Sequence, residues 1–115
     1  MLQIREQKQH HTKILTLTDK FNRDTKTGIQ MLILGAKEMS FPHIILDFSG
    51  VTEIDSTHLE DLFLWYHNMK PQRVQVSVVK PRQYFRYHLD WADLSEIVSI
   101  YASKDEAVEH AESMA

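Results

Sequence analysis

The sequence predicts an α/β fold, in which helices pack on a mixed and mostly parallel β-sheet. Segments with strand-like patterns alternate along the 115 residues with segments whose apolar residues recur at helical spacing. The run "HIILDF" (43–48) is apolar almost throughout, which is typical of a strand covered on both faces of a parallel sheet. The length suits one domain, residues 1–115, and no repeat or Pro/Gly/Ser-rich linker divides the chain.

The segment before this central strand carries two predicted strands and a helix. "KILTLT" (13–18) alternates and contains β-branched residues, and "LQIREQ" (2–7) is a weaker strand candidate that is expected to pair with it as a hairpin. A helix is indicated by apolar residues at positions i, i+3, i+4 and i+7, namely Ile29, Leu32, Ile33 and Ala36. Asp24 or Thr25 is the expected cap at its start.

The segment after the central strand continues the alternation and brings the expected number of helices to about four. A second helix is indicated by Leu59, Leu62, Phe63 and Tyr66, and it ends before Pro71. "VQVSVV" (74–79) is a predicted strand, "PRQYFRYHL" (81–89) a helix and "IVSIY" (97–101) a short strand. The last helix is expected from Ser103, because "SKDE" has a hydroxyl and a carboxylate at capping-box spacing.

Composition and charge argue against several classes of function. Without cysteine the chain has no disulfide framework, thiolate metal site or thiol nucleophile, which makes the reducing cytoplasm the expected compartment. A net charge of −3 argues against a nucleic-acid or anionic-membrane partner, which would require a clustered basic patch. No stretch has the roughly 20 consecutive apolar residues of a membrane span. We therefore expect a soluble protein that does not insert into a membrane.

The stretch "EIDSTHLEDL" (53–62) joins the central strand to the second predicted helix. In open α/β sheets ligands and partners bind at this edge, because the helix N-terminus presents unpaired amides and a partial positive charge. A phosphate on a hydroxyl at this point would lie at the favourable end of the helix dipole.

The wider stretch "IILDFSGVTEIDSTHLEDL" (44–62) resembles the signature of the STAS domain family, the anti-sigma-factor antagonists and their relatives. The family pattern runs from an apolar strand through Asp and a Gly-Val turn to Asp-Ser-Ser/Thr-Gly-Leu-Gly. "KILTLTDKF", "VQVSVVKPR" and "LSEIVSIYASKDEAV" resemble further parts of the family in order and spacing, so that the resemblance covers nearly the whole chain.

The resemblance implies a regulatory role without enzymatic activity or a cofactor. Ser56, directly after Asp55, occupies the position that standalone members present to a GHKL-type serine kinase, which in several families is itself the anti-sigma factor; a PPM-type phosphatase reverses the reaction. The unmodified protein binds its partner and the phosphorylated protein releases it, with transcription or biofilm and polysaccharide production as the output. The alternative is a constitutive STAS subunit that docks on a membrane lipid or anion transporter.

Three positions depart from the family pattern. His58 stands where the family has glycine, Glu60 stands where a small residue usually follows the leucine, and Asp93 replaces a glycine before Leu94. An imidazole at position 58 changes the surface that a kinase must fit. The chain is therefore expected either to be specialised for an unusual partner or to have lost phosphorylation, whereas Asp93 is expected to alter a turn more than a function.

Structural and catalytic alternatives exist for the same residues. Thr57 and Glu60 have capping-box spacing, so that Thr57 is the expected cap of the second helix, and Ser56 is alternatively a solvated turn serine. A catalytic triad of Asp55, Ser56 and His58 is not expected, because residues so close in sequence rarely form a relay and no G-x-S-x-G motif surrounds the serine. His10, His11, His58 and Glu60 match no metal-ligand spacing, and no phosphate-binding glycine loop is present.

The second helix also carries a candidate partner surface. His58, Asp61 and Trp65 follow one another at i, i+3 and i+7 on a stripe that starts beside Ser56. An aromatic anchor beside a switchable charge suits a protein interface, and we expect Leu64 at its rim. The alternative for Trp65 is packing against the first helix.

Overall fold

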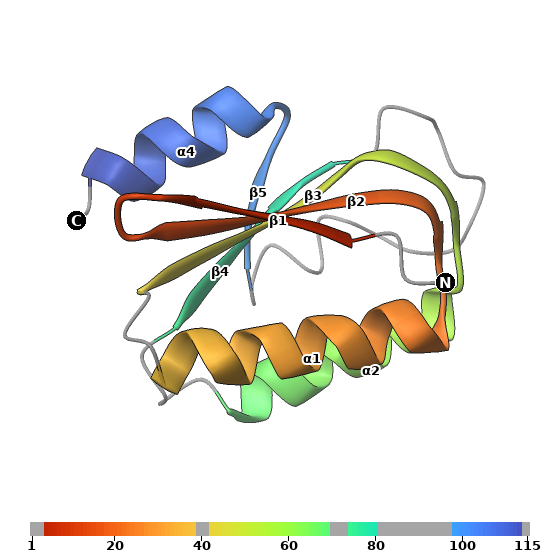
Figure 1. Cartoon of the computed structure of the whole chain (residues 1–115). Coiled ribbons are helices and arrows are strands. Elements are labelled where there is room, and N and C mark those ends of the chain that lie inside the picture. Colours follow the sequence, from red (N-terminus) through yellow and green to blue (C-terminus); the bar gives the residue numbers. More distant parts are fainter. Residues whose placement is uncertain (1–3, 39–41, 70–73, 81–97, 114–115) are drawn as a thin grey trace.

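The computed structural model describes residues 4–38, 42–69, 74–80 and 98–113. These residues form a five-stranded sheet with helices on both faces (Figure 1). The elements are β1 (Ile4–Gln9), β2 (Thr12–Phe21), α1 (Arg23–Glu38), β3 (His43–Ile54), α2 (Ser56–Asn68), β4 (Gln75–Val79), β5 (Ser99–Tyr101) and α4 (Lys104–Ser113). The strands lie in the order β1-β2-β3-β4-β5. β1 is antiparallel to β2, and all other neighbours are parallel, which confirms the mixed and mostly parallel sheet.

The helices form two unequal layers on this sheet. α1 and α2 lie side by side against one face, and α4 covers the other (Figure 1). The described residues contain three helices, fewer than the four or so that the sequence predicts. The predicted helix over residues 81–89 lies outside the described part of the chain. The predicted hairpin is confirmed, because β1 pairs with β2 from Ile4↔Leu17 to Gln9↔Thr12.

The larger hydrophobic core lies between the sheet and the pair α1 and α2. Every residue of "HIILDF" is buried, as expected for a central parallel strand. The residues that predicted the two helices from their spacing supply most of the helical side of this core: Ile29, Ile33, Ala36, Leu59, Leu62, Phe63 and Tyr66. Leu32, the remaining one of the eight residues that predicted the two helices, is partly exposed. A smaller cluster under α4 contains Ile14, Ile45, Val79, Ala107 and Ala111.

Tyr66 links α2 to β4 through its hydroxyl. The hydroxyl donates to the backbone oxygen of Val74 at 2.8 Å and accepts from the backbone nitrogen of Val76 at 3.1 Å. Burial raises the pKa of Tyr66, so the phenol remains neutral and can keep both bonds. This pairing satisfies two backbone groups near the start of β4, ahead of Ser77↔Ser99, the first residue pair with β5.

β2 and β3 extend together beyond the rest of the sheet. β3 pairs with β4 only as far as Asp47, but it continues alongside β2 to the pair Phe21↔Ile54. The pairing shifts register between Thr16 and Thr18 and again after Asp19, which has a positive φ of 66°. These irregularities bend the two-stranded extension toward the starts of α1 and α2 (Figure 1).

Candidate functional site

Asp55 caps the start of α2. Its backbone is extended, and its Oδ1 accepts hydrogen bonds from the backbone nitrogens of Thr57 at 3.1 Å and His58 at 3.4 Å. The helix therefore begins at Ser56, and the predicted role of Thr57 as the cap is wrong. The reason is that Asp55 lies one residue before the first helical residue, where its carboxylate reaches the free amides of the first turn.

Ser56 is the first residue of α2, and its side chain is partly exposed. Because Asp55 supplies the cap, the Ser56 hydroxyl is not needed for that purpose. Within the described residues this hydroxyl makes no hydrogen bond. A hydroxyl that is partly exposed, unpaired and located at the positive end of a helix dipole is available for esterification by a phosphate.

The start of α1 is joined directly to the start of α2. The backbone nitrogen of Asp55 donates to the oxygen of Phe21 at 2.8 Å, one residue before the cap of α1. That cap is Asn22, whose Oδ1 accepts from the backbone nitrogens of Asp24 at 3.1 Å and Thr25 at 3.2 Å. The prediction of Asp24 or Thr25 as the cap is therefore wrong. Thr25 instead returns a bond, because its hydroxyl accepts from the nitrogen of Asn22 at 3.3 Å.

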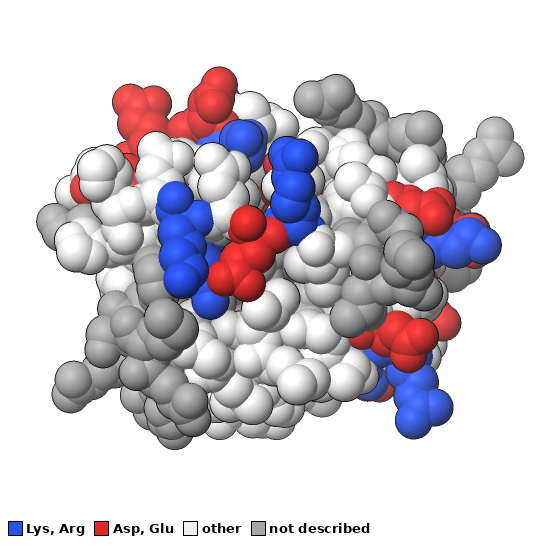
Figure 2. Space-filling model, viewed as in Figure 1, with Lys and Arg blue, Asp and Glu red and all other residues white. Residues whose placement is uncertain are grey.

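Most carboxylates around this pair of helix starts have a nearby basic group. The pairs are Lys20–Glu53 at 3.8 Å, Lys26–Asp61 at 3.9 Å and His58–Asp55 at 3.9 Å. Both lysines belong to the β2–α1 segment, which sequence reasoning did not include in the site. Their contribution depends on the pairing of β2 with β3 for Lys20 and on the packing of α1 beside α2 for Lys26, and it could not be read from the local motif. Figure 2 shows acidic and basic side chains next to one another in the upper part and at the right of this view, whereas its lower middle is largely uncharged.

The predicted partner surface is divided between two sides of α2. Asp61 pairs with Lys26 of α1, and Trp65 is partly buried and packs against the larger core. His58 shares this side by helical spacing. Leu64 lies on the other side and is 57% exposed, and Asp61 also keeps 56% of its side chain exposed. The structure therefore places Ser56 and Leu64 in solvent-accessible positions, and it places Asp61 and Trp65 on the side of α2 that faces α1.

His58 is the residue that replaces the glycine of the family pattern. Its Nε2 faces the Asp55 carboxylate, and only 26% of its side chain is exposed. Within the described chain its Nδ1 is enclosed and has no hydrogen-bond partner. The imidazole therefore fills space beside the cap.

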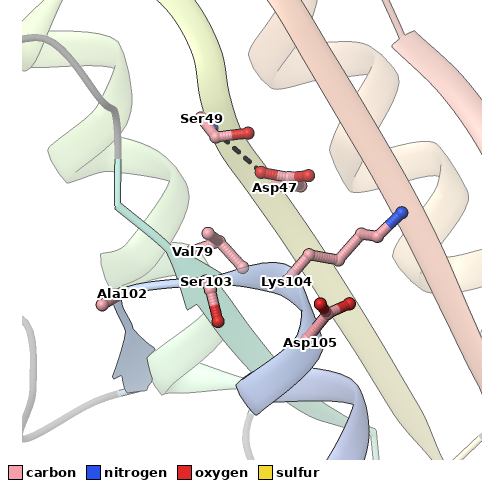
Figure 3. Close-up of a pocket in the computed structure, with 7 residues that line it drawn as sticks. All are labelled: Asp47, Ser49, Val79, Ala102, Ser103, Lys104 and Asp105. Carbon is pink, nitrogen blue, oxygen red and sulfur yellow. Dashed lines mark hydrogen bonds between the residues drawn. The ribbon is translucent and has the colours of Figure 1, made fainter.

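A hollow lies on the α4 side of the sheet, beyond the end of β4 (Figure 3). This cavity of about 330 Å³ is lined by Asp47, Ser49, Val79, Ala102, Ser103, Lys104 and Asp105. Asp47 is buried and accepts a hydrogen bond from the backbone nitrogen of Ser49 at 2.9 Å. Ser103 caps α4 by accepting from the nitrogen of Glu106 at 3.2 Å, which confirms the predicted cap. Sequence reasoning missed the cavity because three separate segments form it.

Within residues 4–38, 42–69, 74–80 and 98–113, no three His, Cys, Asp or Glu side chains are grouped so that they could hold a metal ion. None of the described helices is both long enough and apolar enough to cross a membrane.

The fold and the site define a small α/β protein that presents a serine at the start of a helix beside the central strand. The profile of the STAS domain matches residues 3–107, and the chain therefore belongs to the STAS domain family. This confirms the resemblance seen in the sequence. No protein of curated function shows significant sequence similarity to the chain.

Solved structures with the same fold include several anti-sigma factor antagonists. The unphosphorylated form of the antagonist SpoIIAA superposes with a TM-score of 0.73 and 16% identity, covering 97% of this chain and 98% of that one. An antagonist from Mycobacterium paratuberculosis gives 0.72 and 16%, covering 97% and 95%. SpoIIAA from Bacillus in its phosphorylated form gives 0.67 and 16%, covering 93% and 97%. At such identities the similarity establishes the fold.

Proposed function

We propose that this protein is a non-enzymatic binding switch controlled by phosphorylation of Ser56. The observation that carries the proposal is the Ser56 hydroxyl, which is partly exposed and unpaired within the described chain because Asp55 caps α2. Membership of the STAS domain family supports it. The occurrence of a structurally similar antagonist in both unphosphorylated and phosphorylated forms supports it further.

The proposed partners are a GHKL-type serine kinase that also acts as the anti-sigma factor, and a PPM-type phosphatase. The unmodified protein binds the kinase or a related regulator, and the phosphorylated protein releases it. The output is transcription or biofilm and polysaccharide production. The proposed partner surface is the start of α2 and its continuation, comprising Asp55, Ser56, Thr57, His58, Asp61, Leu64 and Trp65.

One phosphate can supply the change in binding free energy that release of the partner requires. Changing a partner from mostly bound to mostly free takes about two to four decades in affinity, or about 3 to 5.5 kcal/mol. A phosphate adds about −1.5 to −2 charges at neutral pH, and an interface would have to desolvate them beside the Asp55 carboxylate. The fold itself tolerates the charge, because Ser56 lies at the positive end of the α2 dipole.

Phosphopeptide mapping tests the proposal directly. The protein is purified from its native host under phosphatase inhibition, together with Ser56→Ala and Thr57→Val variants. We expect a phosphate on the peptide that contains Ser56 in the wild type and in Thr57→Val, and none in Ser56→Ala. A phosphate that persists in Ser56→Ala, or a wild-type protein that is never phosphorylated when its partner is released, would contradict the proposal.

A further inference from the structure

The side of α2 that faces α1 is already occupied by contacts within the chain. Asp61 pairs with Lys26 at 3.9 Å, and His58 lies 3.9 Å from Asp55. Trp65 packs against the core. Asp61 remains 56% exposed and its pair with Lys26 is a surface contact, so the main obstacle to a partner on this side is the part of Trp65 that is packed on the core.

The solvent-facing side of α2 carries a different row of residues. Ser56, Glu60 and Leu64 follow one another at i, i+4 and i+8, so each side chain lies one helical turn from the next. Glu60 is exposed, and Leu64 is 57% exposed. The row therefore places the hydroxyl, a carboxylate and an apolar side chain along a single accessible ridge.

Glu60 differs from its acidic neighbours in having no compensating charge. Glu53 has Lys20, Asp61 has Lys26, and Asp55 is used as the cap. Glu60 has no ion pair with any residue in the described part of the chain. An exposed carboxylate of this kind complements a basic side chain on another protein.

We propose that the partner of the switch docks along the ridge Ser56–Glu60–Leu64, with a lysine or arginine against Glu60 and an apolar pocket around Leu64. This inference rests on the proposed function and identifies the chemistry of the partner. Glu60 determines specificity, because a partner without the matching cation would bury an unpaired carboxylate. Leu64 is the anchor, and Ser56 lies at the end of the same ridge, where a phosphate would meet the partner's surface.

Other exposed apolar residues provide a matched comparison. Met31 and Leu34 are 68% and 44% exposed, but they lie on α1 away from the residue that is modified. Leu34→Ala therefore removes the same side chain as Leu64→Ala from a neighbouring helix. Glu109 is exposed on α4, across the sheet from α2, so Glu109→Gln matches Glu60→Gln in its change of charge.

The experiment measures dissociation constants for one purified partner, defined as the protein that wild type retains and Ser56→Asp loses. We expect Leu64→Ala to weaken binding about tenfold or more, and Glu60→Gln to weaken it about three- to tenfold with a smaller dependence on salt. Leu34→Ala and Glu109→Gln should change it less than twofold. Thermal unfolding of each variant establishes that the fold is intact.

The outcomes separate this inference from the proposed function. If Ser56→Asp releases the partner but Glu60→Gln and Leu64→Ala bind like wild type, the switch stands and the docking ridge is overturned. If Ser56→Asp retains every partner, the proposed switch is contradicted, and so is the proposal that the ridge binds the partner of that switch. A Leu64-dependent dimer of this chain with no effect on partner binding would also overturn the inference, because the ridge would then be a contact between two copies.

Discussion

Asp55 is the residue on which the geometry of the site depends. Its carboxylate satisfies two amides of the first turn of α2 and also faces His58. This arrangement leaves the neighbouring Ser56 hydroxyl without a structural role among the described residues. In the proposed switch, the helix cap and the modified hydroxyl thus belong to adjacent side chains, so a phosphate could be added to Ser56 without removing the cap.

Replacing Asp55 tests this division of roles. Asp55→Ala should lower the free energy of unfolding by about 1 kcal/mol, because the helix loses its cap, whereas Asp55→Asn should restore most of that loss. Chemical denaturation followed by circular dichroism measures both. The matched control is Asp105→Ala, an exposed acidic residue in the first turn of α4 where Ser103 is the cap. Equal stability of Asp55→Ala and wild type would contradict the assignment of Asp55 as the cap.

At the scale of elements, Tyr66 fixes α2 against β4 and so fixes the direction of the ridge that starts at Ser56. Tyr66→Phe removes the hydroxyl and leaves the oxygen of Val74 and the nitrogen of Val76 without this partner. We expect a loss of about 1 to 3 kcal/mol in the free energy of unfolding.

Tyr101→Phe is the control for this prediction. The Tyr101 hydroxyl bonds to Nδ1 of His110 at 2.6 Å, but at an exposed position where water can replace it. Its removal should cost clearly less than the removal of the Tyr66 hydroxyl. Similar losses in both variants would show that the Tyr66 hydroxyl contributes no more to the free energy of unfolding than an exposed hydroxyl does.

The elements were largely predictable because apolar spacing reports burial directly. The residues that indicated α1 and α2 are buried in the core, with Leu32 as the partial exception, and "HIILDF" is the central strand. The errors concern the helix starts, where the cap lies two residues earlier than expected at Asp55 and two or three residues earlier at Asn22. Several hydroxyl and carboxylate side chains near a helix start can act as its cap, and the local sequence does not determine which of them does.

The candidate site was only partly predictable for a related reason. The local motif predicts Ser56 as the acceptor, but the side of α2 that is free depends on where α1 lies. The pair Lys26–Asp61 and the packing of Trp65 on the core reveal that side, and both depend on contacts between segments far apart in the sequence. The cavity beside Asp47 was not predicted for the same reason, because segments that are separate in the sequence form it.

At the scale of the whole molecule, the two faces of the sheet differ in how firmly they are covered. α1 and α2 bury the larger core, whereas α4 contributes the small residues Ala107 and Ala111 to the smaller cluster, with Val108 packed against it. His43 lies buried on the central strand near α4. Burial lowers the pKa of His43, and His110 acts in the same direction, while a hydrogen bond with Gln75 and the charge of Glu112 oppose it.

The lowered pKa of His43 predicts a dependence of stability on pH. The unfolded chain takes up a proton on His43 below about pH 6.5, whereas the folded protein resists it, so stability is lost as the pH falls below that value. Urea denaturation at about pH 7.5 and about pH 5.5 should show a smaller loss for His43→Gln than for wild type. His67→Gln, at an exposed position on α2, should behave like wild type. An equal loss in all three proteins would exclude His43 as the source.

A comparison of two baits in the native host tests the central claim most directly. Wild-type and Ser56→Asp proteins are used to capture partners, with Ser113→Asp on α4 as the control for added charge, and the captured proteins are identified by mass spectrometry. We predict a kinase or regulator that wild type and Ser113→Asp retain and Ser56→Asp loses or holds more weakly, since aspartate supplies only about half of the phosphate charge. Equal recovery of the same proteins by all three baits, transporter subunits for example, would contradict a switch at Ser56.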